Sequence, residues 1–174
     1  VLFDGVPRYG ALFGQVLGDG IALPAIGALE VFKSPQPSQF GNGYAAVNVL
    51  PKFMKDEGRE VVLGASGGSF ATIAESLSGG LREGPLDVYL SQSWASTDGH
   101  RDHSRAQQQN YYANGGYAFN QHWNIRLLAN AVDSQTLAPM PELRPTATNG
   151  ILWPDAERFD TRTFLATLTL DHRY

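Results

Sequence analysis

The chain of 174 residues contains no cysteine, which excludes disulfide bonds and thiolate metal sites. A chain without thiols is also compatible with export through an oxidising compartment, where free cysteines would mispair. Charged residues make up only 17% of the chain, and the formal net charge is −4. This balance leaves no basic patch for nucleic acid, so we expect no nucleic-acid partner.

Long apolar runs are missing as well, although 43% of the residues are hydrophobic. No run approaches the roughly 18 consecutive apolar residues of a membrane-spanning helix. A transmembrane β-barrel stays open, because its strands need only about 10 alternating residues. The sequence also lacks a GxSxG motif, a phosphate loop and an HExxH motif. We therefore expect a protein that is not an enzyme and that needs no cofactor.

Alternation of apolar and polar residues dominates the chain after residue 58. Within it, Leu90 and Ser91 belong to opposite parities, and a period of two places such neighbours on opposite faces of a strand. The pattern is clear at residues 86–96, 111–119, 123–131 and 163–171, and weaker at residues 59–67 and 70–79. We predict six strands from these segments.

The predicted connections alternate in length. Residues 81–85 and 120–122 are short, residues 97–109 and 133–160 are long, and only the tight connection at residues 67–69 breaks the rule. Short turns at one end and long loops at the other are typical of outer-membrane barrels. Six aromatic residues lie towards the predicted strand ends, as an interfacial girdle requires: Tyr89, Trp94, Tyr111, Tyr117, Phe119 and Trp123.

The first 54 residues have a different texture, rich in glycine and proline. Short apolar runs at residues 1–3, 26–32 and 45–50 predict short strands, with a helical turn near residues 22–26. Residues 55–58, reading KDEG, form a charged hinge that ends on glycine. The sequence therefore predicts an N-terminal part at 1–54, a hinge at 55–58 and a strand-rich part at 59–174.

Three motifs occur in a fixed order along the chain. The first is VLFDGVP at residues 1–7, and the third is DGHRDHS at residues 98–104. The second runs from residue 29 to 52 and is carried by Glu30, Val31, Lys33, Pro35, Phe40, Gly41, Val47, Asn48, Val49 and Lys52. Together they resemble TonB-dependent outer-membrane receptors of the siderophore-receptor type, in which the first two motifs belong to the plug domain and the third to a barrel surface loop.

The resemblance implies a mainly β fold, in which the C-terminal part of a plug precedes about six antiparallel strands of a barrel of about 22 strands. It implies active import of a scarce solute, most often a ferric siderophore or a similar metal chelate, through the outer membrane of a Gram-negative bacterium. The expected partners are a TonB-type energy-coupling protein and outer-membrane lipid. Because Val1 lies inside a predicted strand, we interpret the chain as an internal fragment. Its signal peptide and coupling box are then expected upstream.

Two groups of residues are candidates for function. The resemblance implies that Glu30 and Lys33 form plug–barrel contacts, and the alternative for both is a solvated strand end. Cationic and aromatic side chains suit an anionic iron chelate through charge pairing and stacking. The ligand-binding candidates are Arg8, Tyr9, Phe13, Arg101, His103 and Arg105. Ordinary solvated surface is the alternative for each of these six. It is also the favoured interpretation of the His and Asp residues in the third motif, which lack the spacing of a metal site.

Two other classes of protein remain open at this point. A passive outer-membrane pore or adhesin would have no plug, so the first two motifs would be coincidental. A soluble β-rich binding module would present one polar face to water and would have turns of similar length at both ends. Unequal connections and outward aromatic residues favour the receptor.

Overall fold

A small mixed sheet occupies the N-terminal part of the chain. The computed structural model describes residues 1–7, 21–33, 45–139 and 156–172. The sheet has the order β2-β1-β4-β3 and contains β1 (Leu2–Phe3), β2 (Val6–Pro7), β3 (Ile26–Lys33) and β4 (Ala45–Pro51). The expected helical turn is a 3₁₀ turn, η2 (Leu23–Ala25), which leads directly into β3.

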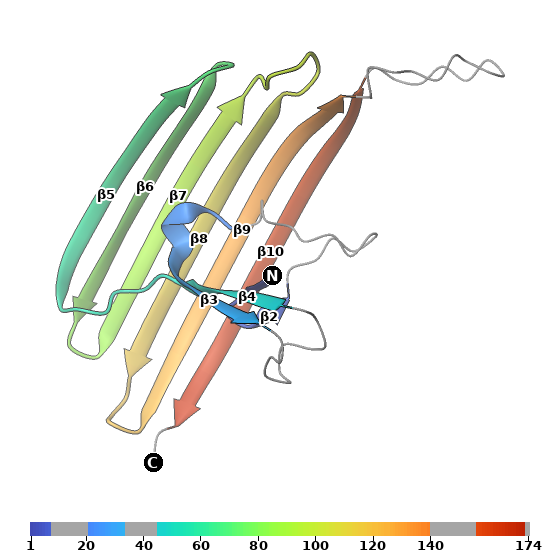
Figure 1. Cartoon of the computed structure of the whole chain (residues 1–174). Helices are drawn as coiled ribbons and strands as arrows, with labels where there is room; N and C mark the ends of the chain where they lie inside the picture. Colours follow the sequence, from blue (N-terminus) through green and yellow to red (C-terminus); the bar gives the residue numbers. More distant parts are fainter. Residues whose placement is uncertain (8–20, 34–44, 140–155, 173–174) are drawn as a thin grey trace.

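A second sheet of six antiparallel strands follows, in the order β10-β9-β8-β7-β6-β5 (Figure 1). Its strands are β5 (Gly58–Gly68), β6 (Thr72–Glu83), β7 (Leu86–Thr97), β8 (Ala106–Ala118), β9 (Trp123–Pro139) and β10 (Ala156–His172). Every strand pairs with its neighbour in the sequence, so the sheet is a simple meander. The six predicted strands are confirmed, but β9 and β10 are longer than their apolar alternation indicated, since polar residues continue both strands.

The connections at the two ends of this sheet differ in length, as predicted. Tight turns lie between β6 and β7, at Gly84 and Pro85, and between β8 and β9, at residues 119–122. Gly84 adopts a φ of 57°, which glycine tolerates without strain. At the opposite end lie the longer β7–β8 connection, residues 98–105, and the short β5–β6 turn at residues 69–71; β9 ends at Pro139 and β10 begins at Ala156, also at this end.

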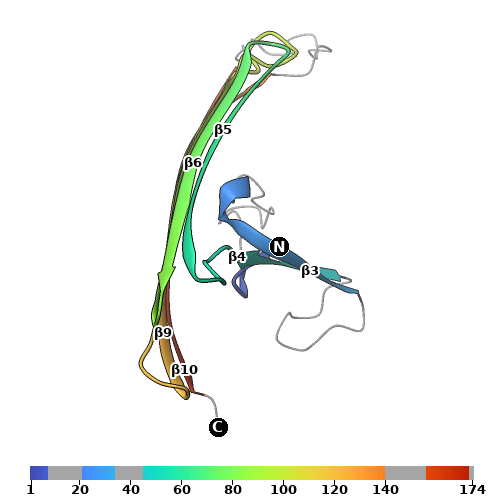
Figure 2. The ribbon, with the colours of Figure 1, turned by 90° about the vertical axis from the view of Figure 1, so that its left-hand side faces the viewer.

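The small sheet lies on the concave side of the curved six-stranded sheet (Figure 2). A shared hydrophobic core, called the joint core below, lies between the two sheets. Its buried residues come from both sheets, from the η2 turn and from the segment between the sheets: Phe3, Ala25, Val49, Met54, Tyr89, Tyr112 and Leu128. The rings of Phe3 and Tyr112 meet edge to face, with centroids 6.3 Å apart. Burial of these apolar groups between the sheets is the main contribution to holding them together.

The two faces of the large sheet have opposite character. On the inward face, Asn110, Asn114 and Asn130 are each only 1% exposed. The outward face carries exposed apolar side chains at alternate positions, among them Leu63 at 79% and Phe164 at 72%. One expected member of the aromatic girdle is wrong, because Tyr89 has the inward parity and is buried in the joint core. Within the described residues, no helix is long and apolar enough to cross a membrane.

The predicted limits 1–54, 55–58 and 59–174 can be set beside these sheets. The small sheet ends at Pro51 and the large sheet begins at Gly58. The intervening segment, residues 52–57, is called the linker below. The assignment of the two parts as separate domains stays a prediction.

Candidate functional site

Side chains of the inward face hold the backbone of the linker. The carbonyl oxygen of Lys52 accepts a hydrogen bond of 2.6 Å from the Tyr112 hydroxyl and one of 3.1 Å from Asn114 Nδ2. Arg82 Nη1 donates to the carbonyl oxygen of Met54 at 3.2 Å. These two carbonyls belong to no sheet ladder. Side chains of the six-stranded sheet, called the wall below, therefore satisfy groups that would otherwise need water.

The side chain of Lys52 also joins the linker to the wall. Its ammonium group lies 3.0 Å from a carboxylate oxygen of Glu60, in β5, and 4.7 Å from the ring centre of Tyr89, in β7. Burial disfavours the charged ammonium, but interactions with Glu60 and Tyr89 outweigh this effect and raise the pKa of Lys52. Lys52 is therefore a cation over the physiological pH range and forms both contacts in its charged state.

A second set of polar groups lies on the wall next to the linker. Arg126 donates two hydrogen bonds to the Asp87 carboxylate, at 2.9 and 2.8 Å, and one of 2.9 Å to Asn114 Oδ1. The guanidinium group also lies over the Phe53 ring, 4.4 Å from its centre. The Asp87 side chain is only 7% exposed, so this bidentate pair has little competition from water. Asn114 connects this pair to the Lys52 carbonyl, because its Oδ1 accepts from Arg126 and its Nδ2 donates to that carbonyl. The hydrogen bonds from Tyr112, Asn114 and Arg82 to the linker carbonyls are together called the linker clamp below.

Asn48 organises the small sheet from within. Its amide donates a 3.0 Å hydrogen bond to Glu30, and its side-chain oxygen accepts one of 3.0 Å from the backbone N–H of Gly5. The structure thus places Glu30 against a residue of its own sheet, and the exposed Lys33 at the end of β3. Their role in plug–barrel contact stays a prediction, whereas Lys52 and Phe53 make the wall contacts described above.

A cavity of about 550 Å³ separates the η2 turn from the inward face of β5 to β8. Leu23 and Pro24 line it from the small sheet's side, and Ser76, Ser93 and Gln108 line it from the wall. Leu23 is 84% exposed, so its apolar side chain is left uncovered beside this open cavity. Apolar side chains from the η2 turn and polar side chains from the six-stranded sheet line this cavity together, so it suits a ligand that has both apolar and polar surface.

The β7–β8 loop brings together three of the predicted ligand-binding residues. A cavity of about 490 Å³ is lined by Arg101, His103 and Arg105, together with Phe70 and Leu137. The loop is fixed locally, because Arg105 Nε donates to Asp98 at 3.1 Å and the Ser104 hydroxyl donates to the Arg101 carbonyl at 2.6 Å. In the described ranges, no group of three or more His, Asp or Glu residues could hold a metal ion.

The other three ligand-binding candidates, Arg8, Tyr9 and Phe13, lie outside the described residues. The contacts of Tyr112, Asn114 and Arg82 with the linker carbonyls were not predicted from the sequence. The inward parity of Asp87, Tyr112 and Asn114 was readable, and it could have marked them as lumen-facing polar groups. Their convergence on Lys52 depends on the strand register and on the seating of the small sheet, which alternation alone does not give.

Comparisons with known proteins bear on the fold. No protein-family model matches the sequence, and no curated protein matches it. The architecture, however, is that of the C-terminal part of a plug followed by antiparallel barrel strands, as predicted.

One solved structure with this likeness is FpvA of P. aeruginosa, bound to a heterologous pyoverdine and iron. The TM-score is 0.80 over 99% of this chain, at 15% sequence identity. The chain covers 25% of the FpvA chain. Identity this low shows a shared fold, and the activity of the whole protein is a matter for proposal.

Proposed function

We propose that this chain forms part of a TonB-dependent outer-membrane transporter that binds and imports a scarce solute, most simply a ferric siderophore. The observation that carries the proposal is a small sheet seated on the polar, concave face of a curved β-wall whose other face is apolar. A sheet in this position would obstruct the lumen of a passive pore. A soluble module would be less stable, because exposing so many outward leucine, valine and phenylalanine side chains to water is unfavourable.

The outward face supports a location in the outer membrane. Its exposed apolar side chains recur at alternate positions of all six strands, which is the pattern of a lipid-facing barrel wall. Tyr117, Phe119 and Trp123 gather near the β8–β9 turn, where an aromatic girdle would meet the lipid headgroups. The lipid partner is thus the bilayer that surrounds the wall.

The solute class is supported by the two cavities on the long-loop side. Arg101 and Arg105 line one of them together with Asp98 and Asp102, so this cavity offers both cationic and anionic groups to a polar chelate. The other lies over Leu23 and Pro24 and provides an apolar and amide-bearing surface for a bulky ligand. FpvA, which shares the fold, was solved with pyoverdine and iron. The proposal includes no catalytic step and no resident cofactor.

Energy coupling is the remaining part of the proposal. A TonB-type protein would act on segments outside this chain, and the linker clamp would keep the end of the plug attached to the wall while the rest moves. Polar contacts such as those of Lys52 exchange with water more readily than a packed apolar core does.

The experiment uses the full product of the gene that encodes this chain, in its native host and in a strain lacking the gene. Uptake of ⁵⁵Fe supplied as ferric pyoverdine, as a ferric hydroxamate and as a ferric catecholate is measured, with and without a protonophore. The proposal expects protonophore-sensitive uptake of one chelate that requires the gene. Uptake that continues without a proton gradient would instead indicate a passive pore, and equal uptake of every chelate in both strains would refute transport of these solutes.

A further inference from the structure

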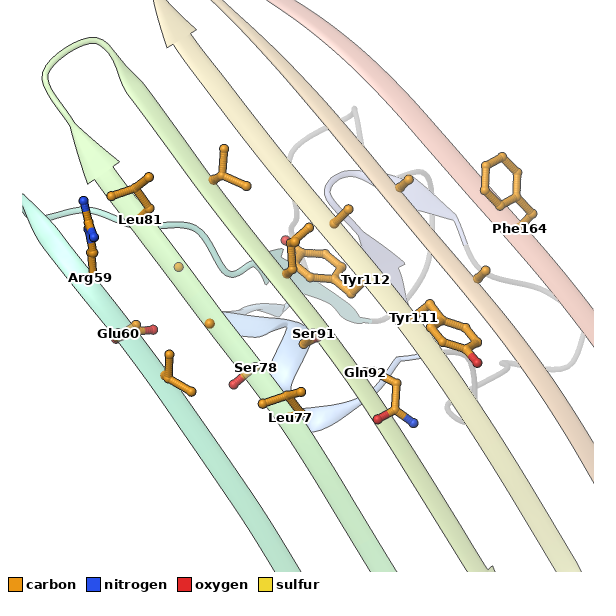
Figure 3. A pocket seen from close by; sticks show the side chains of 18 residues that line it. Arg59, Glu60, Leu77, Ser78, Leu81, Ser91, Gln92, Tyr111, Tyr112 and Phe164 are labelled. Atoms are coloured by element: carbon orange, nitrogen blue, oxygen red, sulfur yellow. The ribbon is translucent and has the colours of Figure 1, made fainter.

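An open groove of about 900 Å³ crosses the outward face of the six-stranded sheet, behind the small sheet (Figure 3). Its floor consists of residues with small side chains or none, namely Gly79, Ala113 and Ala129. These three positions lie in one row across the sheet, with Leu90 of β7 between Gly79 and Ala113. The larger side chains of Leu77 and Tyr111 border the floor.

The lining of the groove is mostly hydrocarbon, with Gln92 and the Tyr111 hydroxyl as polar groups on the outward side. The polar residues Ser78 and Ser91 contribute to it, but both are buried and have the inward parity. The carboxylate of Glu60 is likewise turned inward, where it pairs with Lys52 at 3.0 Å. Of the charged residues that line the groove, only Arg59 is therefore left on its outward side. Apart from Arg59, Gln92 and the Tyr111 hydroxyl, the outward side chains of the groove are apolar, so it matches an alkyl chain better than a polar solute.

Arg59 gives the groove a direction. It is the first outward residue of β5, at the sheet end that carries the linker and the tight Gly84–Pro85 turn (Figure 3). The residue is exposed, and within the described part of the chain it has no ion pair. An arginine at the end of an apolar surface reaches towards the membrane interface, and its guanidinium group binds phosphate through two parallel hydrogen bonds.

We propose that the groove binds a phospholipid of the periplasmic leaflet, with one acyl chain along the floor of Gly79, Ala113 and Ala129 and the phosphate on Arg59. The inference rests on the proposed outer-membrane function, because it needs a lipid leaflet around the wall. A second copy of the chain fits less well, since a symmetric contact through this groove would oppose two Arg59 groups and supply no anion. The charge of Arg59 and the apolar floor together select a lipid with an anionic headgroup.

The test measures lipid binding to the full gene product, purified from outer membranes in a mild detergent. Native mass spectrometry follows titrations with dioleoylphosphatidylglycerol and with dioleoylglycerol, which has the same chains without the phosphate. We expect the phospholipid to bind about tenfold more tightly, the effect of one charge-assisted contact. Arg59→Gln should abolish this difference. Ala129→Leu, which fills the floor, should weaken binding of both lipids about fivefold.

Matched variants separate the groove from the rest of the wall. Arg162→Gln removes an outward arginine that is paired with Asp133, and Ala65→Leu enlarges an exposed outward alanine of β5 that does not line the groove; neither should change binding. Equal phospholipid binding by all four variants would overturn the inference, and so would a dimer that Ala129→Leu dissociates. Heat-modifiable migration shows that each variant is folded. A gene product absent from the outer membrane would contradict the proposed function itself, whereas intact chelate uptake without selective lipid binding would contradict only the groove.

Discussion

The Tyr112 hydroxyl donates a 2.6 Å hydrogen bond to the backbone carbonyl of Lys52, which lies 60 residues earlier in the chain. This contact joins β8 of the six-stranded sheet to the linker that follows the small sheet, and Asn114 Nδ2 donates a second hydrogen bond to the same oxygen. The seating of the small sheet is therefore fixed by its C-terminal connection as well as by the apolar core.

Tyr112→Phe tests this contact. The substitution keeps the ring in the core and removes one donor from the Lys52 carbonyl, so we expect a loss of about 0.5–1.5 kcal/mol in the stability of the linker's docking. Faster amide exchange in residues 52–57 of the full gene product would report it. Tyr111→Phe is the control, because Tyr111 points outward and is 51% exposed. Equal protection in both variants would mean that the hydroxyl contributes nothing.

The Asp87–Arg126 pair should be costly to break. Removing the carboxylate with Asp87→Ala leaves a guanidinium group that is only 25% exposed without its counter-charge. Loss of one partner of such a pair typically costs about 3–5 kcal/mol. The shift in chemical unfolding of the full gene product measures the effect. Asp133→Asn, at an outward and largely exposed pair with Arg162, should leave the unfolding curve unchanged.

A double substitution sharpens that test. Asp87→Ala combined with Arg126→Met removes both charges and should recover much of the stability lost in the single variant, because no buried charge is left unpaired. If the double variant is as unstable as the sum of the two single variants, the pair acts through separate contacts, such as that of Arg126 with Phe53.

These contacts also show where reasoning from the sequence succeeds and where it stops. Alternation predicted the six strands, and unequal connections predicted the two different ends of the sheet, because both depend on local order along the chain. Neither pattern predicted the hydrogen bonds to the Lys52 carbonyl, since these depend on how the small sheet docks on the six-stranded sheet. The misassignment of Tyr89 to the outer girdle has a simpler origin. An aromatic residue near a strand end is typical of a girdle, but parity decides which face a strand residue occupies, and Tyr89 has the inward parity of Asp87.

Lys52 predicts a dependence of stability on alkaline pH. Its pKa is raised in the folded state above the ordinary 10.5, so the stabilisation from its charge is complete below that pH and is lost as the pH rises through the folded-state pKa. Because the side chain is 34% exposed, solvent screening keeps the effect small. The difference in stability between the wild type and Lys52→Met should be constant from pH 7 to about 10 and shrink above it. A difference that is unchanged at higher pH would contradict the role of the charge.

Gly80 leaves room for the linker and for the core. A Cβ atom at this position would meet the side chain of Met54 and would lie 2.9 Å from the Tyr89 ring. Gly80→Ala should therefore push the linker away from the wall, with a cost of about 1–3 kcal/mol. The expected signature is lower amide protection in the linker and a lower melting temperature. Gly115→Ala is the matched control, because its nearest contact would be an ordinary 3.8 Å. The close-approach argument fails if the two variants melt together.

The sheet edges predict how the 174 residues behave alone. β5 and β10 each have one neighbour in the described sheet, so each presents a free edge of N–H and C=O groups. Lipid cannot satisfy such groups, and only a closed barrel removes them. We expect the isolated polypeptide to aggregate or to stay partly unfolded in detergent micelles, without a heat-modifiable band on a gel. Co-refolding with a polypeptide that supplies the remaining strands should restore such a band, because both edges then find partners. A stable, heat-modifiable species formed by these residues alone would show that the two edges are closed in some other way.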